Sequence, residues 1–325
     1  MPADRAALER LHALPRLTLA AAPTPVEELS RLRAALGAGP VLLVKRDDAL
    51  PFGFGGNKIR KLQVVAAQAL AAGADTLITT GGVQSNHARA TAAVAARLGL
   101  RCILIANGVE QARPTANALL DRLLGAEIDY VDSRDARAPA MDRAADRVRA
   151  AGGNPFVIPL GASTPLGAAA YAMAVGELLD RIHPPDTIVL SSSSGGTQAG
   201  VIAGCRLHGL RTRVTGISAD DPSAAIAADI RRILGGMEQL LGVAAGALSD
   251  ADIDVDDRFV GGGYGVPTAG SAEAIELCAR QEALFLDPTY TSKAMAALIA
   301  RIRSKELTGG TALFWHTGGQ VGLFA

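Results

Sequence analysis

Cysteine is scarce in this sequence of 325 residues. The three cysteines, at positions 102, 205 and 278, are an odd number and are widely separated. Such a set provides neither a disulfide framework nor a metal site with zinc-type ligand spacing. We therefore expect no bound metal. The simplest interpretation is that these are buried, reduced thiols in a cytoplasmic protein.

Net charge is absent as well, because 32 basic side chains balance 32 acidic ones. Nucleic-acid-binding proteins usually carry a basic surface, and the aromatic residues that stack on bases make up only 4% of this chain. No run reaches the ~18 consecutive apolar residues of a membrane span, and the first ten residues lack the apolar core of a signal peptide. We therefore expect neither a nucleic-acid partner nor a membrane partner.

Short β-branched segments alternate with segments rich in alanine and leucine. This alternation predicts an α/β fold with open, mostly parallel sheets covered by helices on both faces. An aspartate-rich stretch, 250–257, is typical of a surface loop or an edge strand. The predicted strands are 41–45, 76–80, 102–106, 127–131, 156–159, 187–191, 214–218 and 312–315. The predicted helices are 58–72, 87–98, 115–124, 140–151, 165–180, 197–207 and 271–284.

Ligands of open α/β sheets bind beyond the carboxyl ends of the strands, and the glycine-rich loop at 51–62 is the first candidate. It leads into a predicted helix whose first turn contains Lys58, Arg60 and Lys61. The helix dipole disfavours cations there, so the pattern indicates a nearby anion or a lysine with a lowered pKa. The alternative is an exposed basic helix start. Lys58 also occupies the place of the third glycine of a dinucleotide-binding motif, which excludes that motif.

Two more loops have the composition of anion sites. In 79–87, a strand is followed by two glycines and by Ser85 and Asn86, which could be helix N-caps or could expose N–H groups to a carboxylate or phosphate. In 190–200, a Ser/Gly loop precedes a helix, as in a phosphate cup. It lacks the Gly-Lys-Ser/Thr of a Walker A loop, and an ordinary Ser/Gly turn is the alternative.

Three further loops, all in the C-terminal part of the chain, are candidates for the same site. Residues 314–319 follow a C-terminal strand, and Tyr264 and Tyr290 lie in loops rich in glycine or proline, where a packing role is the simpler interpretation. The loops together offer one lysine on a helix start, one phosphate cup and one carboxylate cup, and they contain no metal motif. This combination fits pyridoxal 5′-phosphate as cofactor and an amino acid as substrate.

Five motifs resemble, in matching order, those of the D-cysteine desulfhydrase / 1-aminocyclopropane-1-carboxylate deaminase family of fold-type II (tryptophan synthase β-like) pyridoxal phosphate enzymes. The motifs are 55–62, 84–87, 194–200, 287–290 and 316–319. The resemblance extends from about residue 17 to the C-terminus. It implies a large domain formed by 1–50 and 165–325, a small inserted domain at 51–164, the cofactor in the cleft between them, and a homodimer.

The resemblance also implies roles for individual residues. Lys58 would bind the cofactor covalently, Asn86 would contact its 3′-oxygen, and Thr317, together with Thr291, would face its pyridine nitrogen. The implied catalytic residues are Lys58, Ser85, Tyr264 and Tyr290. The implied cofactor-binding residues are Lys58, Lys61, Asn86, Ser194, Gly195, Gly196, Thr197 and Thr317. The implied substrate-binding residues are Ser85, Asn86, His87, Tyr264 and Tyr290.

Three positions separate the two branches of this family. The deaminase branch has a glutamate after the second tyrosine, a leucine in the His-x-Gly-Gly motif and a glutamine after Ser-Asn; here these are Thr291, Thr317 and His87. A carboxylate would keep the pyridine nitrogen protonated, which opening a ring without a Cα hydrogen needs more than β-elimination does. The residues therefore favour the desulfhydrase-like branch.

The predicted reaction is an α,β-elimination on a small β-substituted amino acid, with D-cysteine giving pyruvate, sulfide and ammonia. Lys58, displaced from the cofactor by the substrate amine, would remove the Cα proton. The alternatives are 1-aminocyclopropane-1-carboxylate deaminase, L-cysteate sulfo-lyase and a pyridoxal-phosphate-binding protein without turnover. Residues 220–262 match the family pattern poorly, so the motifs leave open which substrate is used and its chirality.

Overall fold

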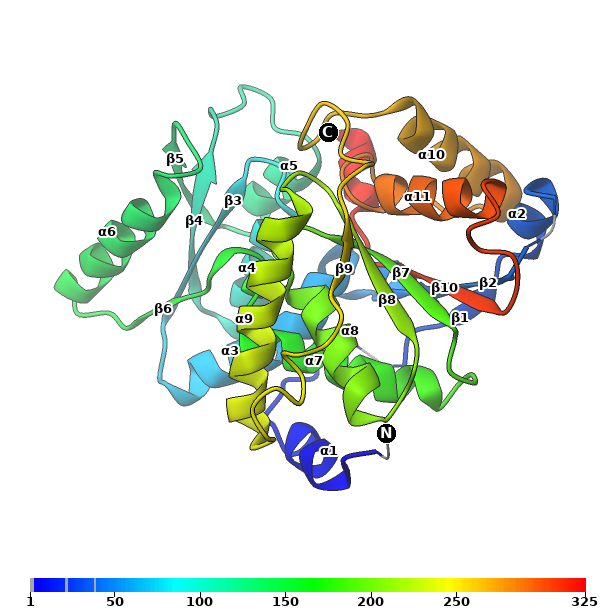
Figure 1. Cartoon of the computed structure of the whole chain (residues 1–325). Coiled ribbons are helices and arrows are strands. Elements are labelled where there is room, and N and C mark those ends of the chain that lie inside the picture. The colour runs from blue at the N-terminus through cyan, green and yellow to red at the C-terminus, as the bar shows by residue number, and fades with distance from the viewer. Residues whose placement is uncertain (1–2, 21–22, 38) are drawn as a thin grey trace.

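A computed structural model of the chain describes residues 3–20, 23–37 and 39–325. It contains a six-stranded sheet in the order β1-β2-β10-β7-β8-β9 and a four-stranded sheet in the order β5-β4-β3-β6 (Figure 1). Only the β1–β2 pair is antiparallel. The strands are β1 (Val26–Glu28), β2 (Val41–Arg46), β3 (Thr76–Gly82), β4 (Arg101–Asn107), β5 (Glu127–Val131), β6 (Pro155–Val157), β7 (Thr187–Ser192), β8 (Arg213–Ser218), β9 (Asp254–Asp256) and β10 (Thr311–His316).

Helices cover both faces of each sheet, which confirms the predicted α/β class. The α-helices are α1 (Arg5–His12), α2 (Ser30–Ala35), α3 (Asn57–Ala71), α4 (Asn86–Leu98), α5 (Ala116–Leu123), α6 (Arg137–Ala150), α7 (Pro165–Leu179), α8 (Gly196–Leu207), α9 (Ser223–Leu241), α10 (Ala269–Glu282) and α11 (Thr291–Arg303). Short 3-10 helices are η1 (Asp47–Ala49), η2 (Phe52–Phe54), η3 (Leu160–Ala162) and η4 (Gln320–Phe324). All the predicted strands and helices form, with ends shifted by a few residues. The aspartate-rich stretch contains β9, an edge strand, as one of its two interpretations predicted.

The strands of the four-stranded sheet all lie between residues 76 and 157. Leu104 of β4 points to the face covered by α3 and α4, whereas Ile103 and Ile105 point to the face covered by α6. This is the alternation expected of a strand buried on both sides. The sheet thus falls inside the predicted inserted domain, 51–164, whose boundaries stay a prediction.

The six-stranded sheet is buried in the same way. Leu313 and Trp315 of β10 pack with α7, α8 and α9, and Phe314 packs on the opposite face with α10 and α11 (Figure 1). Because β7 and β10 are central, their carboxyl ends are enclosed by neighbouring segments on both sides. This arrangement makes the loops after them suitable walls for a cavity.

All three cysteines are buried and free, as predicted. Burial raises the pKa of the Cys205 and Cys278 thiols to about 12. Within the described part of the chain, no helix combines the length and the apolar character needed to cross a membrane.

Candidate active site

A cavity of about 330 Å³ lies at the carboxyl ends of strands from both sheets. Its walls include the segments that follow β3, β4, β5, β6, β7, β8 and β10, as expected for open α/β sheets. With the exception of Lys61, the predicted site residues all line it: Lys58, Ser85, Asn86, His87, Ser194, Gly195, Gly196, Thr197, Tyr264, Tyr290 and Thr317.

Lys58 stands in the first turn of α3, at a point where two distant loops touch. The Asn57 N–H donates to the Thr317 carbonyl over 2.9 Å. Gly56 has φ +93°, and a Cβ there would lie 3.0 Å from the same carbonyl oxygen, so a side chain would push the loops apart. Burial lowers the pKa of Lys58 to about 8. A substantial fraction of the amine is therefore neutral near physiological pH, as a nucleophile or base requires.

The start of α8 forms a cup with the chemical features of an anion site. Gly195, at φ +73°, is the N-cap and provides no side-chain hydrogen bond to the first turn. A Cβ on Gly196 would lie 2.6 Å from Ser163 Oγ and 2.9 Å from Lys61 Nζ. Thr197 Oγ1 accepts from Asn57 Nδ2 at 2.9 Å, which leaves its own proton available for donation. Free helix N–H groups, a hydroxyl and bare glycines fit a phosphate.

Lys61 lies behind this cup and does not line the cavity. Its ammonium donates to the Gly161 carbonyl at 3.2 Å and to Ser163 Oγ at 3.3 Å. Ser163 Oγ is in turn 2.7 Å from Ser194 Oγ. Burial and the charge of Lys58 lower the pKa of Lys61 well below its usual value. Lys61 would therefore act on an anion in the cup through Ser163 and through its charge, and such an anion would favour its protonated form.

Ser85 and Asn86 begin α4 with free donors. Ser85 Oγ accepts from Ala88 N at 3.2 Å, so its proton remains available. Asn117 Nδ2 donates to Asn86 Oδ1 at 2.8 Å. This bond fixes the amide orientation and leaves Asn86 Nδ2 as the donor, which suits a phenolate-type oxygen such as the 3′-oxygen of pyridoxal phosphate.

His87 is a buried, neutral ring. Thr79 Oγ1 donates to the Ile158 carbonyl at 2.7 Å, so it accepts from His87 Nε2, which is 2.8 Å away. Burial, with smaller contributions from the charges of Lys58 and Lys61, lowers the pKa of His87 well below its usual value. Among the described residues Nδ1 has no partner, so this nitrogen is an acceptor.

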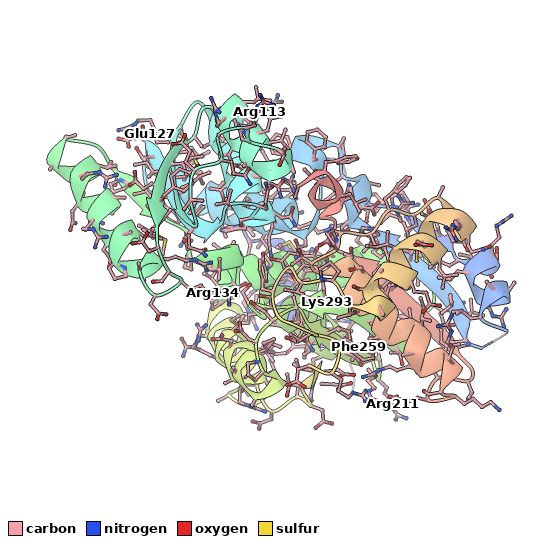
Figure 2. All side chains as sticks on the ribbon, turned by 90° about the horizontal axis from the view of Figure 1, so that it is seen from above. Arg113, Glu127, Arg134, Arg211, Phe259 and Lys293 are labelled. Carbon is pink, nitrogen blue, oxygen red and sulfur yellow. The ribbon has the colours of Figure 1, made fainter. Side chains whose placement is uncertain are left out.

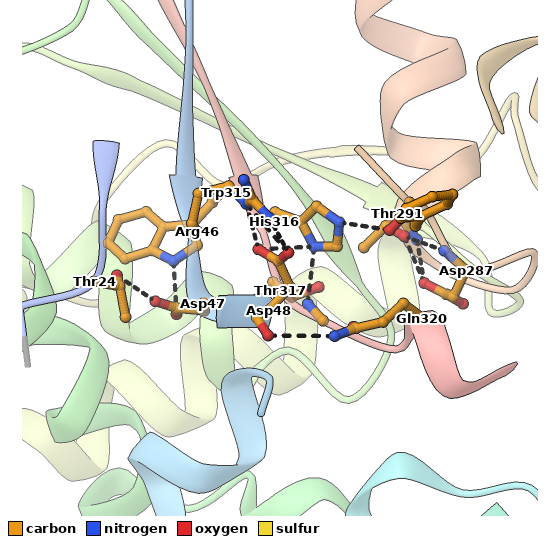
Figure 3. Close-up of polar contacts among 12 residues, drawn as sticks. Thr24, Arg46, Asp47, Asp48, Asp287, Thr291, Trp315, His316, Thr317 and Gln320 are labelled. Atoms are coloured by element: carbon orange, nitrogen blue, oxygen red, sulfur yellow. Dashed lines mark hydrogen bonds and ion pairs between the residues drawn. The ribbon is translucent and has the colours of Figure 1, made fainter. Parts of the chain in front are cut away.

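The two predicted tyrosines form a pair. The Tyr264 and Tyr290 hydroxyl oxygens are 2.5 Å apart and the rings meet edge to face. Burial raises the pKa of both phenols, so both keep their protons at neutral pH. The Asp287 carboxylate accepts from the N–H group of Tyr290 and from that of Thr291 (Figure 3). It thus fixes the start of α11.

The two threonines expected at the pyridine nitrogen differ in position. Thr317 lines the cavity and its Oγ1 is 3.0 Å from Ser191 Oγ. Thr291 is absent from the cavity wall, and its hydroxyl donates to Asp287 Oδ1 at 2.6 Å (Figure 3). The expectation that Thr291 shares this role is therefore wrong, because the carboxylate that fixes the helix start takes its hydroxyl.

Polar residues that the sequence analysis missed also line the cavity, among them Asn107, Arg134, Arg137 and Asp220. Arg134 is 3.0 Å from Asp220, and its guanidinium lies 5.3 Å from the Tyr264 ring centre; Figure 2 shows it on the loop after β5. Arg137 Nε donates to Asn107 Oδ1 at 2.8 Å. These residues follow β4, β5 and β8, so the rule that ligands bind beyond strand ends could have found them.

The cavity thus combines a half-buried lysine of lowered pKa, a glycine-rich cup at a helix start and a fixed amide donor. Together these features define a pyridoxal phosphate site. The chain belongs to the family of pyridoxal-phosphate dependent enzymes, whose model matches residues 17–318.

The most similar curated relatives include D-cysteine desulfhydrases. Those of Klebsiella pneumoniae (strain 342) and Salmonella schwarzengrund (strain CVM19633) are each 39% identical over 327 aligned positions, covering 98% of both chains. A solved structure described as an ACC deaminase homologue has a TM-score of 0.91 at 34% identity and covers 98% of this chain and 96% of its own. Threonine deaminase isoform 2 from Solanum lycopersicum shares the fold, with a TM-score of 0.70 at 15% identity. The match covers 96% of this chain and 83% of the deaminase chain.

Proposed function

We propose that this protein is a pyridoxal-phosphate-dependent lyase that catalyses α,β-elimination on a small β-substituted amino acid, with D-cysteine giving pyruvate, sulfide and ammonia. The observation that carries the proposal is the cavity itself, in which Lys58 lies together with the neutral Ser191–Thr317 hydroxyl pair. The full-length similarity to D-cysteine desulfhydrases supports the choice of substrate.

The cofactor would be held at three points. The start of α8, from Ser194 to Thr197, would bind the phosphate, Asn86 Nδ2 would donate to the 3′-oxygen, and Lys58 would hold the aldehyde. When bound, pyridoxal phosphate supplies an electron sink for the electron pair that remains when the Cα–H bond breaks.

The chain's own residues would do the remaining work. Ser85 Oγ and the N–H groups of the α4 start would bind the substrate carboxylate. The Lys58 amine, with a pKa of about 8, would accept the Cα proton. The Tyr264–Tyr290 pair would flank the side chain, and its protonated phenols can donate a proton to the departing group.

Thr317 would face the pyridine nitrogen with a neutral hydroxyl. The hydroxyl pair with Ser191 offers a hydrogen bond worth roughly 0.5–1.5 kcal/mol, against roughly 1.5–3 kcal/mol for a bond to a charged group. A weaker partner at the nitrogen makes a weaker electron sink. Elimination of a β-substituent tolerates this better than the opening of a cyclopropane ring, which has no Cα hydrogen to lose.

The test is a keto-acid release assay at saturating substrate. The substrates are D- and L-cysteine, cysteate, β-chloroalanine, serine and 1-aminocyclopropane-1-carboxylate. We expect pyruvate from D-cysteine and β-chloroalanine, and much less 2-oxobutyrate from the cyclopropane substrate. Release of 2-oxobutyrate at a rate equal to or above that of pyruvate from D-cysteine would refute both the branch assignment and the electronic argument about Thr317.

We also propose that the enzyme is a cytoplasmic homodimer. The buried, reduced cysteines support a reducing compartment. The dimer is what the resemblance of the five motifs implies.

A further inference from the structure

Arg137 is a cation in the cavity that the roles proposed above do not use. It begins α6 and is half-buried in the cavity wall. Nε and Nη2 both donate to the Asn107 side-chain oxygen, a neutral acceptor at the end of β4. Two donors on one oxygen fix the plane of the guanidinium and leave Nη1 without an acceptor among the described residues.

The charge of Arg137 is only partly balanced, because Asp220 acts on it from a distance but forms no ion pair with it. The neighbouring Arg134 pairs with Asp220 at 3.0 Å, whereas no carboxylate of the described residues lies within ion-pair distance of Arg137. Burial and the charge of Arg134 lower the pKa of Arg137. A partly buried cation without a counter-ion is costly, which indicates that an anion enters the cavity beside it.

The cofactor phosphate is not that anion, because the phosphate cup lies beside the end of β6, and Arg137 is bound beside the end of a different strand of the four-stranded sheet. The segment after β6 touches the phosphate cup, since a Cβ on Gly161 would lie 2.5 Å from Ser194 Oγ. Arg137 is bound at the end of β4, which is two strands away from β6 in the order β5-β4-β3-β6. Two strand spacings amount to roughly 10 Å.

The substrate α-carboxylate already has a site between these two positions. The proposed carboxylate cup, Ser85 and the start of α4, follows β3, which lies between β4 and β6. The part of the substrate that remains is its β-substituent. The Tyr264–Tyr290 pair, which would flank that substituent, lines the same cavity as Arg137, and Arg134 in the loop just before α6 lies 5.3 Å from the Tyr264 ring centre.

We infer that Arg137 binds the β-substituent of the substrate and selects amino acids whose β-substituent carries negative charge or departs as a basic anion. This inference rests on the proposed elimination. In the reaction the Cα–H and Cβ–S bonds break and a Cα–Cβ double bond forms. The sulfur leaves with the bonding pair as sulfide, or as sulfite from a sulfonate, and no oxidant or reductant is needed. The guanidinium would stabilise the charge as it develops.

The first arm of the test measures binding to the holoenzyme. Cysteate has an anionic group on Cβ. Alanine has the same α-carboxylate but no anionic group on Cβ. We expect Arg137→Gln to weaken the binding of cysteate about 10- to 100-fold, the range of one charge-assisted hydrogen bond, and to change that of alanine less than about 3-fold. Arg137→Lys should recover part of the loss. Arg147→Gln removes an exposed arginine from the same helix and is the matched control, expected to change neither.

The second arm measures turnover with two leaving groups. Chloride departs easily and sulfide does not, so Arg137→Gln should lower kcat for D-cysteine about 10-fold or more while changing kcat for β-chloroalanine less than about 3-fold. Equal losses for both substrates, or an equal loss of alanine and cysteate binding, would overturn the inference and assign Arg137 to the α-carboxylate or to folding. If the wild type released no keto acid, the proposed function would fail, and the binding arm would still decide the role of Arg137.

Discussion

At the scale of single residues, three lysines of this structure differ in their hydrogen-bond and ion-pair partners. Lys45 is paired with Glu177 at 2.5 Å, and Lys61 donates to Gly161 and Ser163. Lys58 makes no hydrogen bond within the described part of the chain, and burial is the cause of its lowered pKa. A lysine that is desolvated without a partner is the one best prepared to react as a free amine.

The first prediction concerns the pH dependence of cofactor capture by apoprotein. Because burial lowers the pKa of Lys58 to about 8, the neutral amine should increase about tenfold per pH unit below 8 and level off above it. Stopped-flow mixing with pyridoxal phosphate, followed by absorbance near the visible edge, measures the rate. Lys58→Ala is the control and should give no such band. A rate that still increases tenfold between pH 9 and 10 would mean an ordinary lysine.

The second prediction compares neighbouring positions of the phosphate cup. Thr197→Val removes one hydroxyl and should weaken cofactor binding by about 0.5–3 kcal/mol. Gly196→Val should cost more, because its Cβ would lie 2.6 Å from Ser163 Oγ and 2.9 Å from Lys61 Nζ, where the phosphate must approach. Titration of apoprotein with pyridoxal phosphate gives both affinities. Normal binding by Gly196→Val would place the phosphate elsewhere.

At the scale of elements, what the sequence could predict depends on how local each signal is. The apolar runs of β3, β7 and β10 and the glycine-containing loops after them are continuous in sequence, so they can be predicted from it. β1 (Val26–Glu28) was missed because it has three residues and no apolar alternation. α9 (Ser223–Leu241) was missed although Ile226, Ile230, Ile233 and Leu241 form a helical stripe, because it lies in the segment without family motifs.

The parts of the site that could not be predicted depend on contacts between distant segments. The turn of Thr291 toward Asp287 follows from the N-terminal geometry of α11, and the position of Arg137 on α6 follows from its bond to Asn107 at the end of β4. The sequence places such residues near strand ends but does not say which of them face the same space. The roles of the cavity residues stay predictions that the experiments above decide.

A buried ionic network holds the helix that carries Lys58. Arg60 of α3 donates to Asp47 at 2.8 Å and to Glu177 of α7 at 2.7 Å. Asp47 also accepts from Trp315 Nε1 at 2.9 Å (Figure 3). Burial alone would raise the pKa of Glu177, but hydrogen bonds from Arg60 and Lys45 hold it at about 2. The network thus ties α3 to both α7 and β10.

The third prediction is that Glu177→Gln lowers the free energy of unfolding by about 3 kcal/mol at pH 7. This is the free energy that corresponds to lowering the pKa of Glu177 from its ordinary value to about 2. Because the pKa is lowered in the fold, this stabilisation is complete above about pH 4.5 and is lost as the pH falls toward 2. Urea unfolding at pH 7 and at lower pH measures it, and the gap between the two proteins should narrow on acidification. The control is Glu273→Gln, which breaks an exposed pair with Arg303 and should cost at most about 1 kcal/mol. Equal losses from both variants at pH 7 would show that the network contributes little.

At the scale of the whole molecule, the proposed homodimer needs a surface that can bury apolar side chains. Leu119 and Leu123 lie one turn apart on α5 and are 42% and 73% exposed, and Phe324 of η4 is 75% exposed. α5 and η4 are in contact and lie side by side in Figure 1. Exposed apolar side chains on two elements in contact are typical of protein interfaces.

The last prediction is that this α5–η4 surface forms the dimer contact. The wild type should sediment at twice its chain mass of 33.3 kDa. Leu123→Lys and Phe324→Lys would each place a charge that has to lose its water in the interface. Either substitution should therefore shift the protein toward monomer at micromolar concentration. Leu240→Lys, at a 37% exposed position on α9, is the matched control and should leave the mass unchanged. A wild type that sediments as a monomer would refute the dimer, and dimers that survive both substitutions would place the contact on another face.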